Sequence, residues 1–414
     1  MDKDRCLTSP IFRPLEDRKI LFGVSGGIAA YKAADFCRRL TRLGAHVKVV
    51  LTENGARFVT PLTFSAITGQ QAFSSMFHEN MHQPMSHIEL ARWAEVFVIL
   101  PASADIIGKT ACGIADNLLT TLFLAFQGKK LLFPAMNPAM FKNPVVQENI
   151  SRLRSRGITV AEPEEGTVIC GDTGKGKLPG FEHVLFMIRK SLTSKDLKGM
   201  NVLVTSGPTR EPIDPVRFIS NRSSGKMGAA LATVASLRGA RTHLITGPTC
   251  LDVSKPYLSS IKVETAKEMA KHALTEAKAM DVVIMAAAVA DYTPVSYNEN
   301  KMKKSEQRLV LELEKTQDIL LELGKIKRPG QILVGFCAET DNLIENAFKK
   351  LQKKNLDLII ANDVTTPGAG FDCDTNKVFI IDSEENVEEL PLLHKEEVAE
   401  RIFDKIKNLL SSRS

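Results

Sequence analysis

Residues 206–228 read SGPTREPIDPVRFISNRSSGKMG, and this segment decides how the chain folds. The apolar run 202–204 enters it as a buried strand, and the Ala-rich stretch 229–236 leaves it as a helix. A strand, a glycine turn and a helix in this order are typical of a doubly wound α/β unit. A helix that begins near Gly225 offers N–H groups and its positive dipole end to an anion, and Arg217 and Lys226 add charge. The segment therefore predicts a polyphosphate site.

The lysine of this segment does not belong to a Walker A loop. Lys226 is followed by Met227, where that motif needs Ser or Thr, and Ser220 stands where its first glycine would fall. The alternative is a glycine-rich turn that lets the helix pack closely on the strand, with its cations simply solvated. Several cations and a Ser-Ser-Gly turn within so few residues favour the anion site.

The length of the chain predicts two domains. A chain of 414 residues exceeds one ordinary core. The polar stretch 191–199 ends in glycine, as a linker does, so we place the boundary near residue 190 and expect domains at 1–190 and 191–414. Both halves alternate short apolar strands with helix-length segments, the pattern of parallel sheets in two doubly wound, Rossmann-like α/β domains.

The positions of individual elements follow from the same pattern. The expected strands of the first half are 19–24, 47–51, 96–100 and 130–134, with a helix near 29–43. The second half restarts at Met200, and its further strands are expected at 242–246, 282–287, 333–336, 358–361 and 377–381, before an amphipathic helix near 395–409.

Composition excludes several classes of protein. A net charge of +6 is small for this length, and basic residues do not alternate with aromatic ones, so nucleic acid is not an expected partner. Seven cysteines without any C-x-x-C argue against a disulfide framework and a zinc site. The N-terminus has no apolar signal core and no apolar run is long enough for a membrane span, which predicts a cytoplasmic protein without a membrane partner.

A second glycine turn lies in the first half. Ser25, Gly26 and Gly27 follow a predicted strand and open a helix, where hydroxyl and N–H groups cradle a phosphate. The turn does not fit G-x-G-x-x-G, which disfavours a dinucleotide and leaves room for a mononucleotide such as FMN. Three further clusters, 101–105, 134–140 and 170–177, lie at or after strand ends, where ligands of open α/β sheets bind.

Together with the segment SHIEL at 86–90, these clusters resemble the homo-oligomeric flavin-containing cysteine decarboxylases over roughly residues 18–188. SGGIAAYK, HIxL, PASAD with GIADNLLTT, PAMNxxM and CGDxGxG occur in the order of that family. The resemblance implies that His87 handles a proton, Asn137 holds the substrate carboxylate and Cys170 donates the proton that completes reduction. It also implies FMN contacts at Ser25, Gly26, Gly27, Ile28, Thr52, Ser103, Ala104, Asp105 and Met136.

The second half resembles phosphopantothenate–cysteine ligases over roughly residues 198–408. The resemblance rests on residues 206–228, AAAVADY at 286–292, KMKK at 301–304, GFCAET at 335–340 and ANDV at 361–364. It implies that CTP activates the carboxylate of 4'-phosphopantothenate as an acyl-cytidylate, and that cysteine then displaces CMP. The fused order resembles the bacterial bifunctional coenzyme A biosynthesis proteins, in which the first half decarboxylates this product to 4'-phosphopantetheine. The resemblances imply a flavodoxin-like flavoprotein domain at 1–190 and a nucleotide-binding ligase domain at 191–414.

The ligase roles follow from charge and from the resemblance. Asn221 and Arg217 are implied to contact the phosphopantothenate or its acyl-cytidylate, and Lys301, with Lys303 next, to serve the triphosphate or the second half-reaction. Asp291 follows a buried strand and is the expected Mg²⁺ ligand, since a hard cation prefers a carboxylate. The full set expected to bind substrate or CTP is Gly207, Pro208, Thr209, Arg217, Ser224, Gly225, Lys226, Met227, Ala288, Asp291, Lys303, Lys304, Phe336 and Ala338. Nothing in these residues separates CTP from ATP.

Two other functions remain open from the sequence. A nicotinamide (NAD(P)) oxidoreductase is disfavoured because neither glycine turn fits G-x-G-x-x-G. A flavin-binding regulatory subunit is disfavoured because His87, Asn137 and Cys170 are all retained. The resemblance further implies a homo-oligomer in which decarboxylase trimers are linked by ligase dimers.

Overall fold

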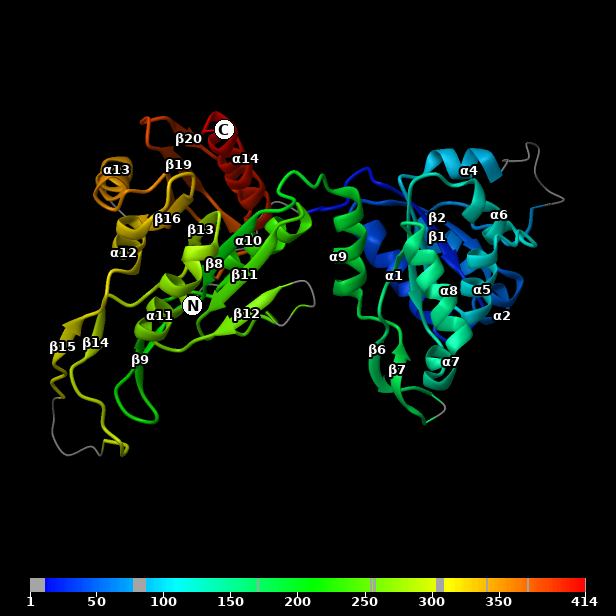
Figure 1. The fold of residues 1–414 in the computed structure, drawn as a ribbon, viewed down its shortest axis with the longest axis horizontal. Helices are drawn as coiled ribbons and strands as arrows, with labels where there is room; N and C mark the ends of the chain where they lie inside the picture. The colour runs from blue at the N-terminus through cyan, green and yellow to red at the C-terminus, as the bar shows by residue number, and fades with distance from the viewer. Residues whose placement is uncertain are drawn as a thin grey trace. The chain divides into compact units, whose positions relative to one another are not determined.

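The computed structural model of this chain describes residues 12–76, 87–169, 171–253, 255, 258–302, 309–339, 342–370 and 372–413. It divides into two compact units, Phe12–Thr193 and Ser194–Ser414, whose elements are labelled in Figure 1.

The first unit is built on a five-stranded parallel sheet with the strand order β2-β1-β3-β4-β5. This is the flavodoxin-like order, which reverses direction between β1 and β3 and opens a crevice for a ligand at the carboxyl ends of these strands. A separate antiparallel hairpin, β6–β7, follows the sheet. The strands are β1 (Lys19–Val24), β2 (His46–Leu51), β3 (Val96–Ala102), β4 (Lys129–Pro134), β5 (Thr159–Val160), β6 (Glu164–Thr167) and β7 (Thr173–Lys177).

Helices cover both faces of this sheet, because successive strand side chains point to opposite sides. Phe22 packs with α1, α3 and α9 in one core cluster, whereas its neighbour Leu21 packs with α4, α5, α6 and α8 in another. The helices are α1 (Ala30–Arg42), α2 (Glu53–Phe58), α3 (Pro61–Thr68), α4 (His87–Trp93), α5 (Ala104–Cys112), α6 (Leu118–Ala125), α7 (Pro138–Lys142), α8 (Pro144–Ser155) and α9 (Phe181–Leu192).

The second unit contains an eight-stranded sheet with the order β12-β11-β8-β13-β16-β17-β19-β20. Its first six strands are parallel in the Rossmann order, with the direction reversing between β8 and β13. The strands are β8 (Asn201–Ser206), β9 (Arg210–Pro212), β10 (Phe218–Ser220), β11 (Arg241–Thr246), β12 (Ser259–Lys262), β13 (Val282–Met285), β14 (Tyr292–Pro294), β15 (Leu313–Lys315), β16 (Ile332–Glu339), β17 (Leu358–Asp363), β18 (Thr375–Asn376), β19 (Val378–Asp382), β20 (Val387–Glu389) and β21 (Leu393–His394).

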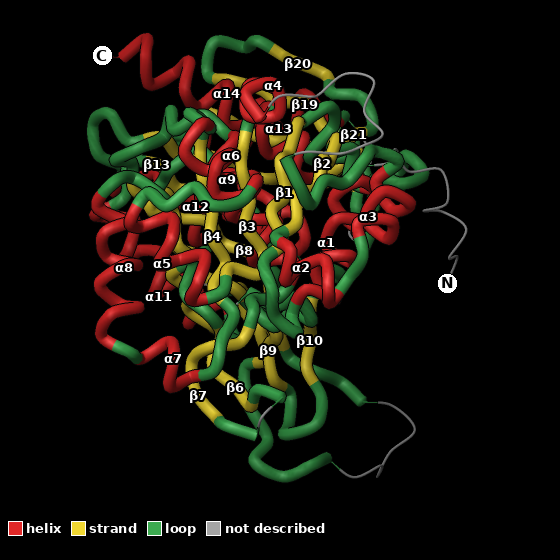
Figure 2. The backbone as a smooth tube through the Cα atoms, turned by 90° about the vertical axis from the view of Figure 1, so that its right-hand side faces the viewer, coloured by secondary structure: helices red, strands yellow, loops and turns green. Residues whose placement is uncertain are grey.

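Helices again lie on both faces of the sheet. Figure 2 colours the helices of the chain red and its strands yellow. Val202 and Val204 pack with α10 and α14, and Leu203 between them packs with α11, α12 and α13. The helices are α10 (Lys226–Leu237), α11 (Ala266–Glu276) with the 3₁₀ turn η2 (Ala277–Ala279), α12 (Ile319–Ile326), α13 (Leu343–Lys353) and α14 (Lys395–Arg413).

The expected fold class, two doubly wound α/β domains, is confirmed by these two sheets. One feature differs from a purely parallel arrangement: β19 and β20 are antiparallel to their neighbours. For β20 the reason is the short connection 383–386 from β19, since a parallel pair needs a crossover of a dozen or more residues.

Candidate active sites in the two units

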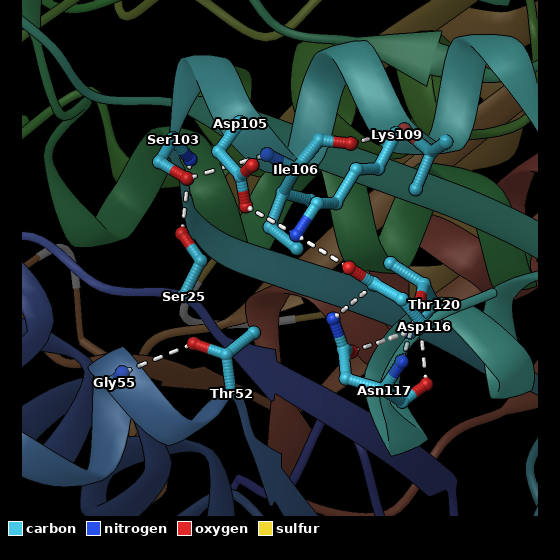
Figure 3. A network of polar contacts seen from close by, with 11 residues as sticks. Ser25, Thr52, Gly55, Ser103, Asp105, Ile106, Lys109, Asp116, Asn117 and Thr120 are labelled. Atoms are coloured by element: carbon cyan, nitrogen blue, oxygen red, sulfur yellow. Dashed lines mark hydrogen bonds and ion pairs between the residues drawn. The ribbon is translucent and has the colours of Figure 1, made fainter. Parts of the chain in front are cut away.

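Several of the predicted flavin-binding residues converge at one edge of the first sheet. The turn 25–28 follows β1, Thr52 follows β2, Ser103 precedes α5, and Met136 follows β4. Because these strands are parallel, their carboxyl ends share this edge. Figure 3 shows the side chains of Ser25, Thr52 and Ser103 gathered there from loops that are far apart in the sequence.

Backbone donors dominate this edge. The N-cap of α1 is Ala29, which supplies no side-chain cap. Within the described part of the chain, the N–H groups of residues 26–29 donate to no other residue. A Cβ at Gly27 would meet no atom within 4 Å, so the turn is open to a ligand on that side. Unpaired N–H groups at a helix N-terminus fit a phosphate, as the FMN prediction requires.

The hydroxyl groups at this edge hold the loops in place. Ser25 is fully buried; its Oγ donates to the carbonyl of Pro101 at 2.7 Å and accepts the N–H of Ser103 at 2.9 Å. Thr52 caps α2 by accepting from the N–H of Gly55 at 3.0 Å. Ser103 caps α5. The Ser25 hydroxyl, which the sequence predicted to contact a phosphate, therefore donates its proton to the Pro101 carbonyl in this structure.

Asp105 belongs to a charged network on α5 (Figure 3). Its carboxylate lies 3.3 Å from Nζ of Lys109, which also contacts Asp116 at 2.8 Å. The hydrogen bond from Lys109 lowers the pKa of Asp116 below its usual range. Asp116 in turn accepts from Asn117, the N-cap of α6, at 2.8 Å. The PASAD and GIADN segments are thus joined by ion pairs.

The hairpin β6–β7 lies against the loop that carries Asn137. The N–H of Met136 donates to the carbonyl of Gly176 at 3.1 Å, and a Cβ on Gly176 would come within 2.3 Å of the Met136 carbonyl. Asn137 Nδ2 donates to Asp172 at 2.5 Å, while its Oδ1 caps α7 through the N–H of Ala139. Only glycine permits this close approach of hairpin and loop.

The two other predicted decarboxylase residues are less defined. His87 is half-buried at the described start of α4. Cys170 lies outside the described residues.

In the second unit, helix α10 begins directly against the end of β8. Its N-cap, Gly225, has a φ of +78°, and a Cβ on Gly228 would come within 2.5 Å of Ser206. The Ser206 hydroxyl donates to the carbonyl of Gly225 at 2.9 Å. The backbone N–H groups of Lys226 and Met227 donate to no residue that the structure describes. Unpaired N–H groups at a helix N-terminus are the feature that the predicted anion site requires.

A cavity of about 660 Å³ opens at this helix terminus. It is bounded by the start of α10, the ends of β13, β16 and β17, and the start of α14. Nine of the predicted ligase residues line it: Asn221, Ser224, Gly225, Lys226, Met227, Ala288, Asp291, Phe336 and Ala338.

Other predicted residues do not line this cavity. Gly207, Pro208 and Thr209 are buried behind its wall, and the carbonyl of Gly207 accepts the N–H of Ala288 at 3.0 Å. Arg217 and Lys301 lie outside the lining residues. Lys303 and Lys304 lie outside the described part of the chain.

Lys226 is already paired in this structure. Its Nζ lies 2.7 Å from the carboxylate of Asp374 and donates to the carbonyl of Asp372 at 2.6 Å. Asn221 joins the turn to the opposite wall, because its Nδ2 donates to the carbonyl of Val289 at 2.9 Å. An incoming triphosphate would compete with Asp374 for the Lys226 ammonium.

Lys395 also lines the cavity, although it was not among the predicted site residues. It is 4% exposed and donates to the carbonyls of Gly370 and Cys373. Burial lowers its pKa to about 8, and the charge of Lys226 adds to the effect. The available signal was its position: a lysine at the first residue of a helix opposes the dipole, so a local reason is needed for it.

Two asparagines complete the inner wall. Asn362 and Asn376 line the cavity, and each has a buried side-chain oxygen without a hydrogen-bond partner among the described residues. Such orphaned acceptors are rare in folded proteins. They leave two hydrogen-bond acceptors on the cavity wall unpaired, which fits a site for a polar ligand.

The predicted metal site has one described candidate ligand. Asp291 is exposed at the cavity, and the described residues contain no group of three or more His, Cys, Asp or Glu placed to hold a metal ion. A single carboxylate fits Mg²⁺ that arrives on substrate phosphates, since this ion keeps several waters and few protein ligands. No helix among the described residues is long and apolar enough to cross a membrane.

Comparison with known families assigns both halves. Residues 9–193 match the Flavoprotein family, and residues 197–410 match the DNA/pantothenate metabolism flavoprotein C-terminal domain. The coenzyme A biosynthesis bifunctional protein CoaBC of Bacillus subtilis (strain 168) is 46% identical over 395 residues, 95% of this chain and 97% of that protein. The protein of the same name from Escherichia coli (strain K12) is 39% identical over 396 residues, 95% of this chain and 97% of its own length.

A third relative carries a different name. The cysteine/cysteine sulfinic acid decarboxylase of an unknown prokaryotic organism is 42% identical over 357 residues, 85% of this chain and 99% of that protein. Identity that extends through both units, together with the two family matches, leaves one assignment. The chain belongs to the family of bifunctional coenzyme A biosynthesis proteins, which join a flavin-dependent decarboxylase to a ligase.

Proposed function

We propose that this enzyme converts 4'-phosphopantothenate and cysteine to 4'-phosphopantetheine in two steps. The unit at 191–414 forms the amide by CTP-dependent activation of the 4'-phosphopantothenate carboxylate as an acyl-cytidylate. The unit at 1–190 then decarboxylates 4'-phosphopantothenoylcysteine with FMN. Two observations together support the proposal. The first N–H groups of α1 and α10 have no partner among the described residues, and the family matches cover both units.

In the ligation, the chain's part is to gather cations and N–H donors around a triphosphate. Lys226 and the first N–H groups of α10 would hold phosphate oxygens, and Phe336 and Ala338 would border the base. Asp291 would bind Mg²⁺ carried by the nucleotide. We assign Arg217 and Asn221 to the phosphopantothenate side, and the lysines of 301–304 to the triphosphate or to the attack by cysteine.

In the decarboxylation, the residues of the α1 cradle would hold the FMN phosphate. FMN, when bound, supplies two-electron redox chemistry next to the substrate sulfur. Asn137 would orient the substrate carboxylate, His87 would handle a proton, and the thiol of Cys170 would protonate the product. The proposed role of Asn137 is supported by its side-chain NH₂ group, which donates to the carboxylate of Asp172.

The test is mass spectrometry of the purified enzyme with 4'-phosphopantothenate, cysteine, Mg²⁺ and either CTP or ATP. The expected wild-type products are 4'-phosphopantetheine and CMP. In a Cys170→Ser variant, we expect the reaction to stop after loss of carbon dioxide and before reduction. Cys112→Ser is the matched control, because Cys112 is an exposed cysteine of the same unit with no proposed role.

Two results would contradict parts of the proposal. Amide formation with ATP but not CTP would overturn the nucleotide, and absence of the amide with either would overturn the ligase assignment. A further incubation with free cysteine as the only substrate tests whether this chain decarboxylates cysteine, the activity for which its third relative is named. Cytoplasmic location and the trimer–dimer assembly stay predictions, which fractionation and mass photometry would test.

A further inference from the structure

Asp214 is a buried carboxylate on which two segments of the ligase unit converge. It lies between β9 and β10, and only 2% of the residue is exposed. Its Oδ1 accepts the backbone N–H groups of Val216 and Arg217, both at 2.8 Å. These bonds close a tight turn that ends at Arg217.

The other oxygen of Asp214 reaches a distant segment. Its Oδ2 accepts the N–H of Met302 at 3.2 Å and lies 3.0 Å from Nε of Arg217. Arg217 completes the triangle, because its Nη2 donates to the carbonyl of Met302 at 2.5 Å. The N–H of Asn298 also donates to the carbonyl of Ile213 at 3.0 Å. The turn and residues 301–302, which we call the lysine segment, are thus fixed to each other across 85 residues of sequence.

The ionised carboxylate of Asp214 is buried, and a buried charge is unfavourable unless other groups stabilise it. Burial opposes ionisation of Asp214, yet the N–H groups of Val216, Arg217 and Met302 hold its pKa below the usual range. A turn alone would be satisfied by a neutral Asn or Ser at this position. What a neutral side chain cannot do is hold a guanidinium beside a lysine-bearing segment, because two cationic segments repel each other without an anion between them.

The two segments that Asp214 joins carry the cations assigned to the anionic substrates. Arg217 retains 40% side-chain exposure although its Nε and Nη2 are held, and Lys301, which is exposed, immediately precedes Met302. The guanidinium is therefore fixed from behind while part of it stays available to a ligand. A bound anion would meet cations whose spacing is already set.

We propose that Asp214 is a positioning residue of the ligase reaction: it fixes Arg217 and the lysine segment that begins at Lys301 relative to each other, so that both anionic substrates meet an arranged set of cations. The inference rests on the proposed function. It adds a residue that touches no substrate and acts only through Arg217 and Met302.

The test is Asp214→Asn in the full-length protein. The amide keeps an oxygen for Val216 and Arg217 but turns an NH₂ group toward the Met302 N–H and the Arg217 guanidinium, where donor would face donor. We expect kcat/KM of ligation to fall about 100-fold, the effect of losing two hydrogen bonds to a charged group. The loss should appear as higher KM values for 4'-phosphopantothenate and the nucleotide, with the KM for cysteine unchanged.

Two internal comparisons separate positioning from folding. The same sample should decarboxylate added 4'-phosphopantothenoylcysteine at the wild-type rate, because that step belongs to the other unit. The matched control is Asp357→Asn: Asp357 is also 2% exposed, accepts the N–H of Leu333 at 2.7 Å and pairs with Lys327 at 2.9 Å. It precedes β17 and does not itself line the cavity, so its loss should lower the melting temperature without changing ligation KM values.

Met302→Pro provides a second variant if Asp214→Asn folds poorly. Proline removes the single N–H that Asp214 accepts from the lysine segment and leaves the carboxylate in place. We expect the same pattern of KM changes, about 10-fold in size, since one bond is lost.

Three results would overturn the proposal. They are unchanged KM values in both variants, an equal rise in the KM for cysteine, or the same kinetic change in Asp357→Asn. If the wild type forms no cysteine conjugate with any nucleotide, the proposed function fails and this inference fails with it. If the wild type forms the conjugate but the variants keep wild-type KM values, only this inference fails, so the two failures are distinguishable.

Discussion

The hydroxyl of Ser25 provides the sharpest test of how the flavin edge is built. Substitution by alanine removes a hydrogen bond to the Pro101 carbonyl and leaves the N–H of Ser103 without its acceptor. The Pro101 carbonyl still accepts the N–H of Ser25 at 3.3 Å, so only the Ser103 donor is orphaned. An orphaned buried donor costs about 1–3 kcal/mol and the lost bond about 1 kcal/mol, so we expect Ser25→Ala to destabilise the first unit by about 2–4 kcal/mol.

Urea unfolding of the flavin-free protein measures this loss. The single tryptophan, Trp93, lies in α4 and reports on the first unit. With a urea dependence of about 2 kcal/mol per molar, the midpoint should fall by about 1–2 M. Flavin titration, followed by quenching of FMN fluorescence, should show affinity about ten-fold weaker, because binding must then order the loop after β3.

Ser65→Ala is the matched control for this variant. The Ser65 hydroxyl makes the same kind of bridge between α3 and the segment after it, donating to the Pro61 carbonyl at 3.1 Å and accepting the N–H of Ala72 at 3.0 Å. Its loss should lower the urea midpoint but leave FMN affinity unchanged. The reasoning is refuted if Ser25→Ala binds FMN as the wild type does, or if Ser65→Ala weakens binding equally.

Three further outcomes are expected. Gly176→Ala places a Cβ within 2.3 Å of the Met136 carbonyl and must displace the hairpin, so kcat/KM of decarboxylation should fall at least about ten-fold while ligation in the same sample is unchanged. Lys226→Met should raise the KM for the nucleotide about 10- to 100-fold in initial-rate assays, and an unchanged value would contradict the assigned phosphate contact. A hydrogen bond from buried Arg238 lowers the pKa of Asp196, so this pair stabilises the folded state above the unfolded carboxyl pKa of about 3.9 and the stabilisation is lost as pH falls through the lower folded value. Asp196→Asn should therefore flatten the decline in urea midpoint between about pH 5 and pH 3, which a parallel decline in variant and wild type would rule out.

The fold was largely predictable because the strand signal is strong and local. Uninterrupted apolar runs such as 96–100 and 202–204 are buried on both faces of a sheet, so their burial shows in the sequence. Glycine turns then locate the ligand edge, because strand ends of parallel sheets must meet there. The antiparallel β19–β20 pair was missed because the sequence pattern of a buried strand does not give its direction.

The candidate sites were predictable as segments but not as contacts. A sequence motif shows that Ser25 lies in the flavin turn, but not that its proton is used by Pro101. Asp214 gave no sequence signal and Lys395 only its place at the start of a helix, because their roles depend on partners that are distant in the sequence and meet only in the folded chain. Such residues look like ordinary surface charges until their burial is known.

The two anion cradles have a consequence for how they can be studied. Among the residues that the structure describes, the donors without protein partners at the starts of α1 and α10 are main-chain N–H groups, which every residue except proline supplies. Alanine in place of Gly27 or Met227 would therefore keep the backbone N–H groups that we propose as phosphate donors, and an alanine scan would miss their contribution. Amide-to-ester exchange, in which an α-hydroxy acid replaces one residue and oxygen takes the place of its N–H, would remove these donors one at a time and measure what each contributes to binding.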